Sequence, residues 1–425
     1  MTLRRVDASR LSARDGSADQ RLTRRSFLLG AAGATALGIA SCSGPGRVVR
    51  SAPAKAASGK PSPVDCPALD AAGGSRNPLW QTALQRGLVY GSSTATWQIS
   101  DKGYASLFAR EAAILFTEDD LLWYRLRPKP TSDLDFRFGD KIVGFARKNG
   151  MLVFGAHLVW DDGFGKGWTR NDLFGMGEKT ARQVLFGTLD DVVKRYRGSV
   201  VAWSVVNEAI NSSGVRHDVP WFQTIGPSYI AESFHRARDA DPDAILVLNE
   251  YGFETDDAYG IETAVDRRAA VLKLLDQLLH QKVPVDALGV QAHLDVSVFD
   301  GFDPRGYRRF LNDVAGRGVK VFVTEMDVLD DTLPEATGPR DRVVADVYRR
   351  YLDAALEEPA VVSLMTFGLS DRYTWLQEDF PRDDGAPRRP LPFDDKLHPK
   401  PAFRALQGAL EGAPPRNVFR VPPRC

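Results

Sequence analysis

The chain has 425 residues, enough for one large barrel domain, and its 43% hydrophobic and 26% charged residues are typical of a soluble globular protein. Its 55 basic residues balance its 55 acidic residues, so the chain lacks the basic surplus that binding to nucleic acid requires. Three cysteines exclude a disulfide scaffold, and six histidines leave little for a multi-histidine metal centre.

The first 42 residues have the pattern of an export signal. Scattered arginines are followed by Arg24-Arg25-Ser-Phe-Leu and then by a run of small and apolar residues, 30–40, the order of regions found in signal peptides. The paired arginines resemble a bacterial twin-arginine signal, and residues 39–42 resemble a lipobox, in which Cys42 would be lipidated. A transmembrane anchor is the alternative, but spanning a bilayer takes about 20 apolar residues and this run is shorter. We therefore expect export by the twin-arginine route, either to secretion or to the cell envelope, with membrane contact only through a lipid on Cys42.

A linker and a folded domain follow the signal. Residues 43–76 are rich in Ser, Pro, Gly and Ala, the composition of a flexible tether. We expect the folded domain to span residues 77–412 and residues 413–425 to form a C-terminal tail. In an exported protein, Cys66 and Cys425 could form a disulfide, because the two ends of a closed barrel lie near each other.

Within the domain, short apolar runs alternate eight times with amphipathic stretches. The predicted strands are 88–94, 114–118, 152–160, 200–208, 244–251, 287–294, 320–328 and 361–369. Helices are predicted between them, the clearest at 178–195, 230–239, 269–280 and 341–356. Apolar strands separated by helices indicate a parallel sheet covered on both faces, and eight such units indicate an α/β fold, the (β/α)8 TIM barrel. A doubly wound open sheet is the alternative, but no glycine-rich phosphate loop follows the first strand.

Most of these strands end in a polar or aromatic side chain. The residues are Glu118, His157, Trp160, Asn207, Glu208, Asn249, Glu250, Tyr251, Gln291, His293, Glu325 and Asp327, with Asp371 and Trp375 after the eighth strand. Because the active site of a TIM barrel lies at the C-terminal ends of its strands, we expect these residues to share one face. Glu208 and Glu325 each close an otherwise apolar run, where a carboxylate needs a partner or a function.

Carboxylates on the fourth and seventh strands face each other across a barrel mouth. Such a pair suits retaining glycoside hydrolysis, in which carboxyl groups about 5–5.5 Å apart act as acid/base and nucleophile, one protonated and the other ionised. Asp327 points to the same side of its strand as Glu325. His293, on the neighbouring strand, could bridge these two carboxylates and give Glu325 an N–H donor.

Polar and aromatic side chains beside the pair could hold a sugar chain. Asn207 could bond to a sugar hydroxyl next to the reacting carbon. Aromatic faces commonly hold pyranose rings, and three aromatic residues end or follow these strands: Trp160, Tyr251 and Trp375. Each of them, taken singly, could equally pack in the core.

At these residues the chain resembles glycoside hydrolase family 10, which contains the endo-β-1,4-xylanases. Three motifs carry the resemblance: Trp203-Ser-Val-Val-Asn-Glu-Ala209, Gly289-Val-Gln-Ala-His-Leu294 and Val323-Thr-Glu-Met-Asp-Val328. Two shorter motifs also match, Leu248-Asn-Glu-Tyr251 and Ser370-Asp-Arg-Tyr-Thr-Trp375. The resemblance covers residues 80–410. It implies a (β/α)8 barrel and a retaining double displacement, with Glu208 as acid/base and Glu325 as nucleophile. It also implies direct contacts at the site from Asn207, Gln291 and His293, with Asp327 orienting His293.

The chain departs from the family pattern where the family binds the glycone sugar. The family has Glu-Asn with a Lys three residues after the Asn; here Glu118 matches, and we expect it to contact sugar. The positions that differ are Asp119 and Leu122 in this motif, Ala156 and Asp161 where the family has histidines, and Phe367 where it has tryptophan. Each lost sugar hydrogen bond is worth about 0.5–1.5 kcal/mol, so we expect an intact catalytic pair and a shifted substrate preference.

The sequence therefore predicts a monomeric glycoside hydrolase that cleaves internal β-1,4-xylosidic bonds in xylan or a related plant polysaccharide, without metal or cofactor. One alternative is a sugar-binding lipoprotein on the same barrel with little or no activity, which would not need two facing carboxylates; another is a hydrolase of a different β-linked glycan. A third alternative is a metal-dependent barrel hydrolase, in which Glu208, Glu250, His293 and Glu325 would be the metal ligands. The His-x-His motif that it would need after the first strand is missing.

Overall fold

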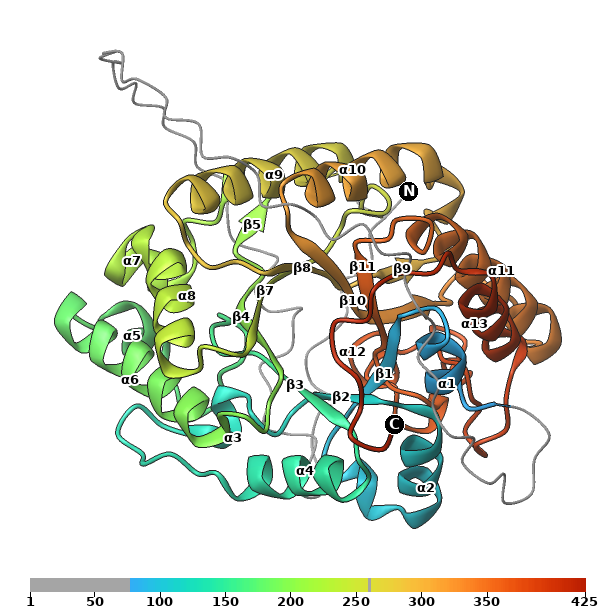
Figure 1. Ribbon diagram of the computed structural model, residues 1–425, viewed down its shortest axis with the longest axis horizontal. Helices are drawn as coiled ribbons and strands as arrows, with labels where there is room; N and C mark the ends of the chain where they lie inside the picture. Colours follow the sequence, from blue (N-terminus) through green and yellow to red (C-terminus); the bar gives the residue numbers. More distant parts are fainter. Residues whose placement is uncertain (1–76, 259–260) are drawn as a thin grey trace.

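Eight parallel strands close into a barrel surrounded by helices in this computed structural model, which describes residues 77–258 and 261–425 (Figure 1). The strands, in order around the barrel, are β1 (Val89–Thr94), β2 (Ile114–Thr117), β3 (Leu152–Gly155), β4 (Ala202–Asn207), β7 (Ile245–Glu250), β8 (Ala287–Val290), β10 (Lys320–Leu329) and β11 (Val361–Thr366). Each strand pairs in parallel with the next, and β11 pairs with β1, so the sheet is closed. The predicted (β/α)8 TIM barrel is confirmed, and the open sheet is excluded.

Helices cover the outside of the barrel (Figure 1). The longer ones are α2 (Lys102–Glu111), α4 (Arg137–Lys148), α6 (Glu178–Tyr196), α8 (Ser228–Ala240), α9 (Ala264–His280), α10 (Pro304–Gly316), α11 (Thr337–Ala355) and α13 (Pro401–Gly412). Shorter elements lie in the connections: α1 (Leu79–Leu84), α3 (Trp123–Leu126), α5 (Arg170–Phe174), α7 (Pro220–Ile225), α12 (Leu376–Asp379), β5 (Ile210–Asn211), β6 (Gly214–Val215) and β9 (His293–Asp295). The four helices predicted most clearly correspond to α6, α8, α9 and α11.

Apolar side chains pack on both faces of the closed sheet. Inside the barrel, Phe116 packs edge to face against Phe154, with ring centroids 5.0 Å apart, and Phe154 packs against Phe322 at 5.9 Å. Outside, a larger apolar cluster joins the strands to the helices. Burial on both faces explains why the strands occur in the sequence as continuous apolar runs rather than as an alternating pattern.

Residues 413–425, expected to form a tail, pack across the N-terminal ends of the barrel strands. The buried guanidinium of Arg416 donates to the carbonyl oxygen of Val361, the first residue of β11, over 2.6 Å. The guanidinium of Arg424 lies 4.2 Å from the ring of Trp80 in α1. The segment therefore covers the face of the barrel that is opposite the C-terminal ends of the strands.

The predicted signal (1–42), the linker (43–76), Cys42 and Cys66 lie outside the described residues. Cys425 is disulfide-bonded, and its pairing with Cys66 stays a prediction. Among the residues that the structure describes, no helix is both long and apolar enough to span a bilayer.

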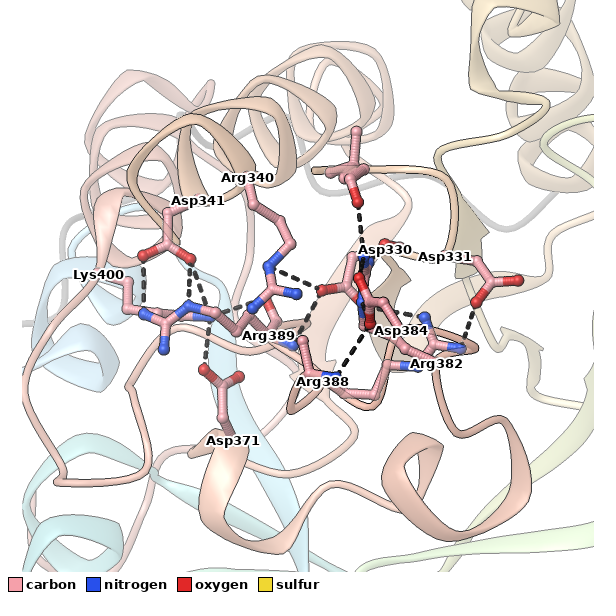
Figure 2. A network of polar contacts seen from close by, with 12 residues as sticks. Asp330, Asp331, Arg340, Asp341, Asp371, Arg382, Asp384, Arg388, Arg389 and Lys400 are labelled. Atoms are coloured by element: carbon pink, nitrogen blue, oxygen red, sulfur yellow. Dashed lines mark hydrogen bonds and ion pairs between the residues drawn. The ribbon is translucent and has the colours of Figure 1, made fainter. Parts of the chain in front are cut away.

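Buried ion pairs fix the long connection between β11 and α13. Asp330, directly after β10, is fully buried and lies 3.2 Å from a guanidinium nitrogen of Arg388 and 3.5 Å from one of Arg340 (Figure 2). At the other end of this network, Lys400 Nζ lies 2.7 Å from a carboxylate oxygen of Asp371. The connection is thereby held against α11 and against the end of β10.

We expect Arg416→Ala to lower the free energy of unfolding by about 2–4 kcal/mol, because several buried carbonyl oxygens lose their donor at once. Urea denaturation measures this change. Arg404→Ala, on the exposed side of α13, is the matched control, and we expect it to change stability by less than about 0.5 kcal/mol. Equal effects of the two substitutions would contradict a structural role for the tail.

Candidate active site

A cleft opens at the C-terminal ends of the barrel strands. Its described lining is made of carboxylates, imidazoles, aromatic rings and one leucine: Glu118, Asp119, Leu122, Tyr124, His157, Trp160, Asp162, Phe164, His293, Glu325, Phe367, Trp375 and Asp379. Five of the predicted site residues belong to this lining and come from five different strand ends: Glu118, Trp160, His293, Glu325 and Trp375. The closed barrel therefore brings together residues that are more than 250 positions apart in the sequence.

Glu325, on β10, is a buried carboxylate with three nitrogen neighbours. Its side chain is 3% exposed. Asn249 Nδ2 donates to Glu325 Oε1 over 2.7 Å, and His293 Nε2 lies 3.3 Å from Glu325 Oε2. His157 Nε2 lies 3.9 Å from Oε1. Burial acts to raise the pKa of Glu325, but the His293 hydrogen bond and the charges of the two imidazoles outweigh it, so the pKa is lowered and the carboxylate is ionised at neutral pH.

His293 lies between Glu325 and a second carboxylate, Asp327. His293 Nδ1 lies 2.8 Å from Asp327 Oδ1, and the two residues are paired in the register of β9 with β10. Burial acts to lower the pKa of His293, but Asp327 and Glu325 raise it to about 9. The imidazole is therefore protonated at neutral pH and donates to both carboxylates. Trp375 Nε1 donates to Asp327 Oδ2 over 2.7 Å, which fixes the outer end of this chain of contacts.

Side-chain amides connect Glu208 to Glu325. Gln291 Nε2 donates to Glu208 Oε1 over 3.0 Å and to Asn207 Oδ1 over 3.2 Å. Asn249 Nδ2 donates to the same Asn207 oxygen over 2.8 Å as well as to Glu325. The two carboxylates therefore belong to one hydrogen-bonded framework; Glu325 lines the cleft, and Glu208 lies outside its described lining.

The backbone at Glu208 adopts a left-handed conformation, with φ 57°, which costs a non-glycine residue about 1–2 kcal/mol. The register of β4 against β7 shifts between Ser204 and Val206, just before this turn. The backbone N–H of Glu208 donates to the carbonyl oxygen of Asn249 over 3.0 Å. This bond fixes the strained turn that ends β4 and presents the Glu208 carboxyl group to Gln291.

Two further buried carboxyl groups lie near Glu208. Asp161 pairs with Arg216 over 2.9 Å, and Arg216 also donates to the backbone oxygen of Glu208 over 3.2 Å. Burial raises the pKa of Asp161 to about 6; Arg216 opposes this rise and Glu208 adds to it. Glu250 accepts the backbone N–H of Ala209 over 2.6 Å, and burial, opposed by a neighbouring arginine and assisted by Glu208, raises its pKa to about 8. Glu208 therefore lies near two carboxyl groups and one guanidinium group, whereas Glu325 lies near two imidazoles.

Residues 79–409 match the sequence profile of glycosyl hydrolase family 10. The chain belongs to glycosyl hydrolase family 10. Endo-1,4-beta-xylanase B of Thermotoga neapolitana is 32% identical over 320 residues, which are 74% of this chain and 86% of that protein. Xylanase 10B from Thermotoga maritima has a TM-score of 0.69 and 30% identity, covering 79% of this chain and 98% of its own. Xylanase 10B from Thermotoga petrophila RKU-1, solved in complex with xylobiose, has a TM-score of 0.70 and 30% identity. The match covers 80% of this chain and 99% of that structure's chain.

In this family 10 glycoside hydrolase, the residues at which we expect a departure from the family pattern have distinct places. Asp119, Leu122 and Phe367 line the cleft. Ala156 is buried without lining it, and the neighbouring His157 supplies an imidazole to Glu325 instead. Asp161 forms the ion pair with Arg216 described above. Apolar or acidic groups thus stand at these positions, and the surroundings of Glu325 are rich in nitrogen donors.

Tyr251 lies outside the described lining of the cleft. It is 38% exposed, and the guanidinium of Arg267 from α9 lies 4.0 Å from its ring. The sequence placed Tyr251 at a strand end but gave no sign of this arginine. The structure also adds Asn249, whose orientation is fixed because Thr324 Oγ1 donates to its Oδ1 over 2.8 Å; its position at the end of β7 was the available signal.

A metal site is not supported by the geometry of this hydrolase. Within residues 77–258 and 261–425, no group of three or more His, Cys, Asp or Glu side chains is placed to hold a metal ion. Glu250, one of the four ligands in the metal-dependent alternative, instead accepts backbone N–H groups and lies 3.4 Å from Arg267.

The raised pKa of His293 predicts a pH-dependent contribution to stability. Because the folded-state pKa of about 9 lies above the usual 6.5, the protonated imidazole stabilises the fold fully below pH 6.5 and loses this contribution as pH rises through 9. We expect the stability difference between the wild type and His293→Asn to shrink over this interval, by at most about 1.4 kcal/mol per pH unit. Urea denaturation at a series of pH values measures it, with His280→Asn at the exposed end of α9 as the control. A difference that is constant with pH would show that His293 is not held protonated.

Proposed function

We propose that this family 10 hydrolase cleaves internal β-1,4-xylosidic bonds in xylan or a related plant polysaccharide by a retaining double displacement. The observation that carries the proposal is the pair of buried carboxyl groups of Glu208 and Glu325, held on one framework of side-chain amides, with the pKa of Glu325 lowered. The similar proteins from Thermotoga neapolitana and Phanerodontia chrysosporium are named endo-1,4-beta-xylanases, and the Thermotoga petrophila structure contains xylobiose. These names support a chain of β-linked xylose as the substrate.

In the first displacement, the Glu325 carboxylate attacks the anomeric carbon while the Glu208 carboxyl group gives its proton to the glycosidic oxygen. The bond to the leaving sugar breaks, and a covalent ester forms between the sugar and Glu325. In the second, the Glu208 carboxylate takes a proton from water, whose oxygen attacks the anomeric carbon and releases Glu325. Each displacement inverts the anomeric centre, so the product keeps the configuration of the substrate.

The surrounding residues have supporting roles in this scheme. Protonated His293 keeps Glu325 ionised, and Asp327 keeps His293 protonated and oriented. The side chains assigned to sugar contacts are Glu118, Trp160, Asn207, Gln291 and Trp375. The scheme uses no metal or cofactor, and one chain contains every residue that it requires.

We also propose that residues 1–42 are a twin-arginine signal with Cys42 as a lipidation site, that residues 43–76 are a tether, and that the exported protein is a monomer. The disulfide at Cys425 supports an oxidising compartment, and we assign its partner as Cys66. Two free thiols in the non-reduced exported protein would argue against that disulfide.

We expect the hydrolase to release short β-1,4-linked xylo-oligosaccharides from xylan, and to release less reducing sugar from β-glucan and mannan. Asp119, Leu122 and Phe367 line the cleft and alter its hydrogen bonding, so the preference among decorated xylans is expected to differ from the family pattern. A reducing-sugar assay on the three polysaccharides, with product sizing, measures both. Release from glucan or mannan but not from xylan would overturn the substrate assignment.

Two carboxylate variants test the mechanism. We expect Glu325→Ala to lower kcat by at least about 10⁴-fold on an aryl xylobioside, because the nucleophile is lost. Azide should restore part of the turnover and give the glycosyl azide with inverted configuration, since azide then attacks directly. With Glu208→Ala, azide should instead give the retained configuration, because it attacks the glycosyl–enzyme formed on Glu325. NMR of the two azide products measures this, and exchanged configurations would reverse the two roles.

A further inference from the structure

Three consecutive residues after β1 bond to three consecutive carboxylates after β2. The backbone N–H and the hydroxyl group of Thr96 donate to Asp120 over 2.7 and 2.9 Å. The indole N–H of Trp97 donates to Asp119 over 3.1 Å, and the side-chain amide of Gln98 donates to Glu118 over 3.2 Å. Two of these carboxylates, Glu118 and Asp119, line the cleft. The loop that carries Trp97 is therefore tied to the wall of the active-site cleft.

Trp97 is held in one orientation without being buried. Its indole N–H donates to Asp119, and its ring packs at right angles against Tyr373, with centroids 5.3 Å apart. Tyr373 is fixed in turn, because its ring packs against Tyr104 at 4.9 Å and its hydroxyl donates to Asp101 over 3.0 Å. Trp97 nevertheless stays 43% exposed, one of the few large apolar side chains with such exposure in the described part of the chain.

The position of Trp97 lies on the rim between two walls of the cleft. Asp119 follows β2, whereas Tyr373 belongs to the connection after β11 that also carries Trp375. Strand β1 lies between β2 and β11 in the barrel. The exposed indole therefore bonds to one wall of the cleft and packs against a residue of the connection that forms another.

We propose that Trp97 is a binding platform for one sugar residue of the polysaccharide, located beyond the sugar that Glu118 contacts. The apolar C–H face of a pyranose ring stacks on the exposed indole, which combines a large apolar surface with a polar N–H group. Because the indole is already fixed by Asp119 and Tyr373, little side-chain freedom is lost on binding. The platform rests on the proposed function, since it needs a polymeric neutral glycan as substrate.

The platform predicts an effect that grows with substrate length. We expect Trp97→Ala to lower kcat/KM about tenfold more on xylan than on an aryl xylobioside, which is too short to reach the rim. Trp97→Phe keeps an aromatic face but removes the N–H donor to Asp119, so we expect it to restore most of the activity on xylan. An equal loss on both substrates in Trp97→Ala would mean that Trp97 only holds Asp119 in place, and no loss on either would exclude the platform.

Binding measured without hydrolysis separates this inference from the proposed function. Affinity electrophoresis in gels containing xylan, β-glucan or mannan compares retention of the Glu325→Gln enzyme with that of the Glu325→Gln/Trp97→Ala enzyme. Weaker retention of the double variant in a gel that retains the single variant supports the platform, even where the reducing-sugar assay fails to show xylan cleavage. Equal retention of the two, or retention of neither in any gel, overturns it.

Discussion

The arrangement of side chains in the active site depends on one buried carboxylate, that of Glu325, which has to stay ionised. Removing a carboxylate from water is unfavourable unless donors and positive charge replace the lost solvation. Asn249 and His293 replace it directly, and His293 stays protonated because Asp327 on its other side acts together with Glu325 to raise its pKa. Trp375 then bonds to Asp327. Keeping the proposed nucleophile ionised at neutral pH thus requires fixed groups from three strands and from the connection after β11.

The same framework places Glu208 among different neighbours from those of Glu325. Gln291 links Glu208 to the amides that also bond Glu325, yet the groups nearest to Glu208 include Asp161 and Glu250, which are themselves carboxyl groups with raised pKa values. Arg216 limits this accumulation of negative charge by pairing with Asp161. The proposed acid/base has to gain and lose a proton in each cycle, and Glu208 has both carboxyl groups and a guanidinium group close to it.

The alternation of apolar runs and amphipathic stretches was enough to predict the barrel and to place Glu208, Glu325 and His293 at one end of it. Strands buried on both faces are continuous apolar runs, so a polar residue at the end of such a run is easy to recognise. It could not place side chains that depend on irregular backbone. Glu208 and Ala292 both have positive φ, so the alternation of a regular strand stops there. The strand pattern gave no sign that Arg267, from a different element, lies against the ring of Tyr251. Sugar binding by Tyr251 stays a prediction. The arginines of residues 413–425 bond to backbone carbonyl oxygens. Every residue has a carbonyl group, so the sequence could not predict where this segment packs.

The ion-pair network after β10 connects this chemistry to the fold (Figure 2). Buried ion pairs contribute little to stability on balance, because desolvation offsets their attraction, so apolar packing would hold the connection after β11 equally well. Charged pairs, however, tolerate only one arrangement of their hydrogen bonds, and the Asp330 carboxylate has to meet Arg388 and Arg340 together. Asp330 lies three residues after Asp327 on the same chain, and the connection it holds carries Trp375. The network therefore fixes both partners of the Trp375–Asp327 bond relative to each other, and through His293 it fixes the donor on which the ionised Glu325 depends.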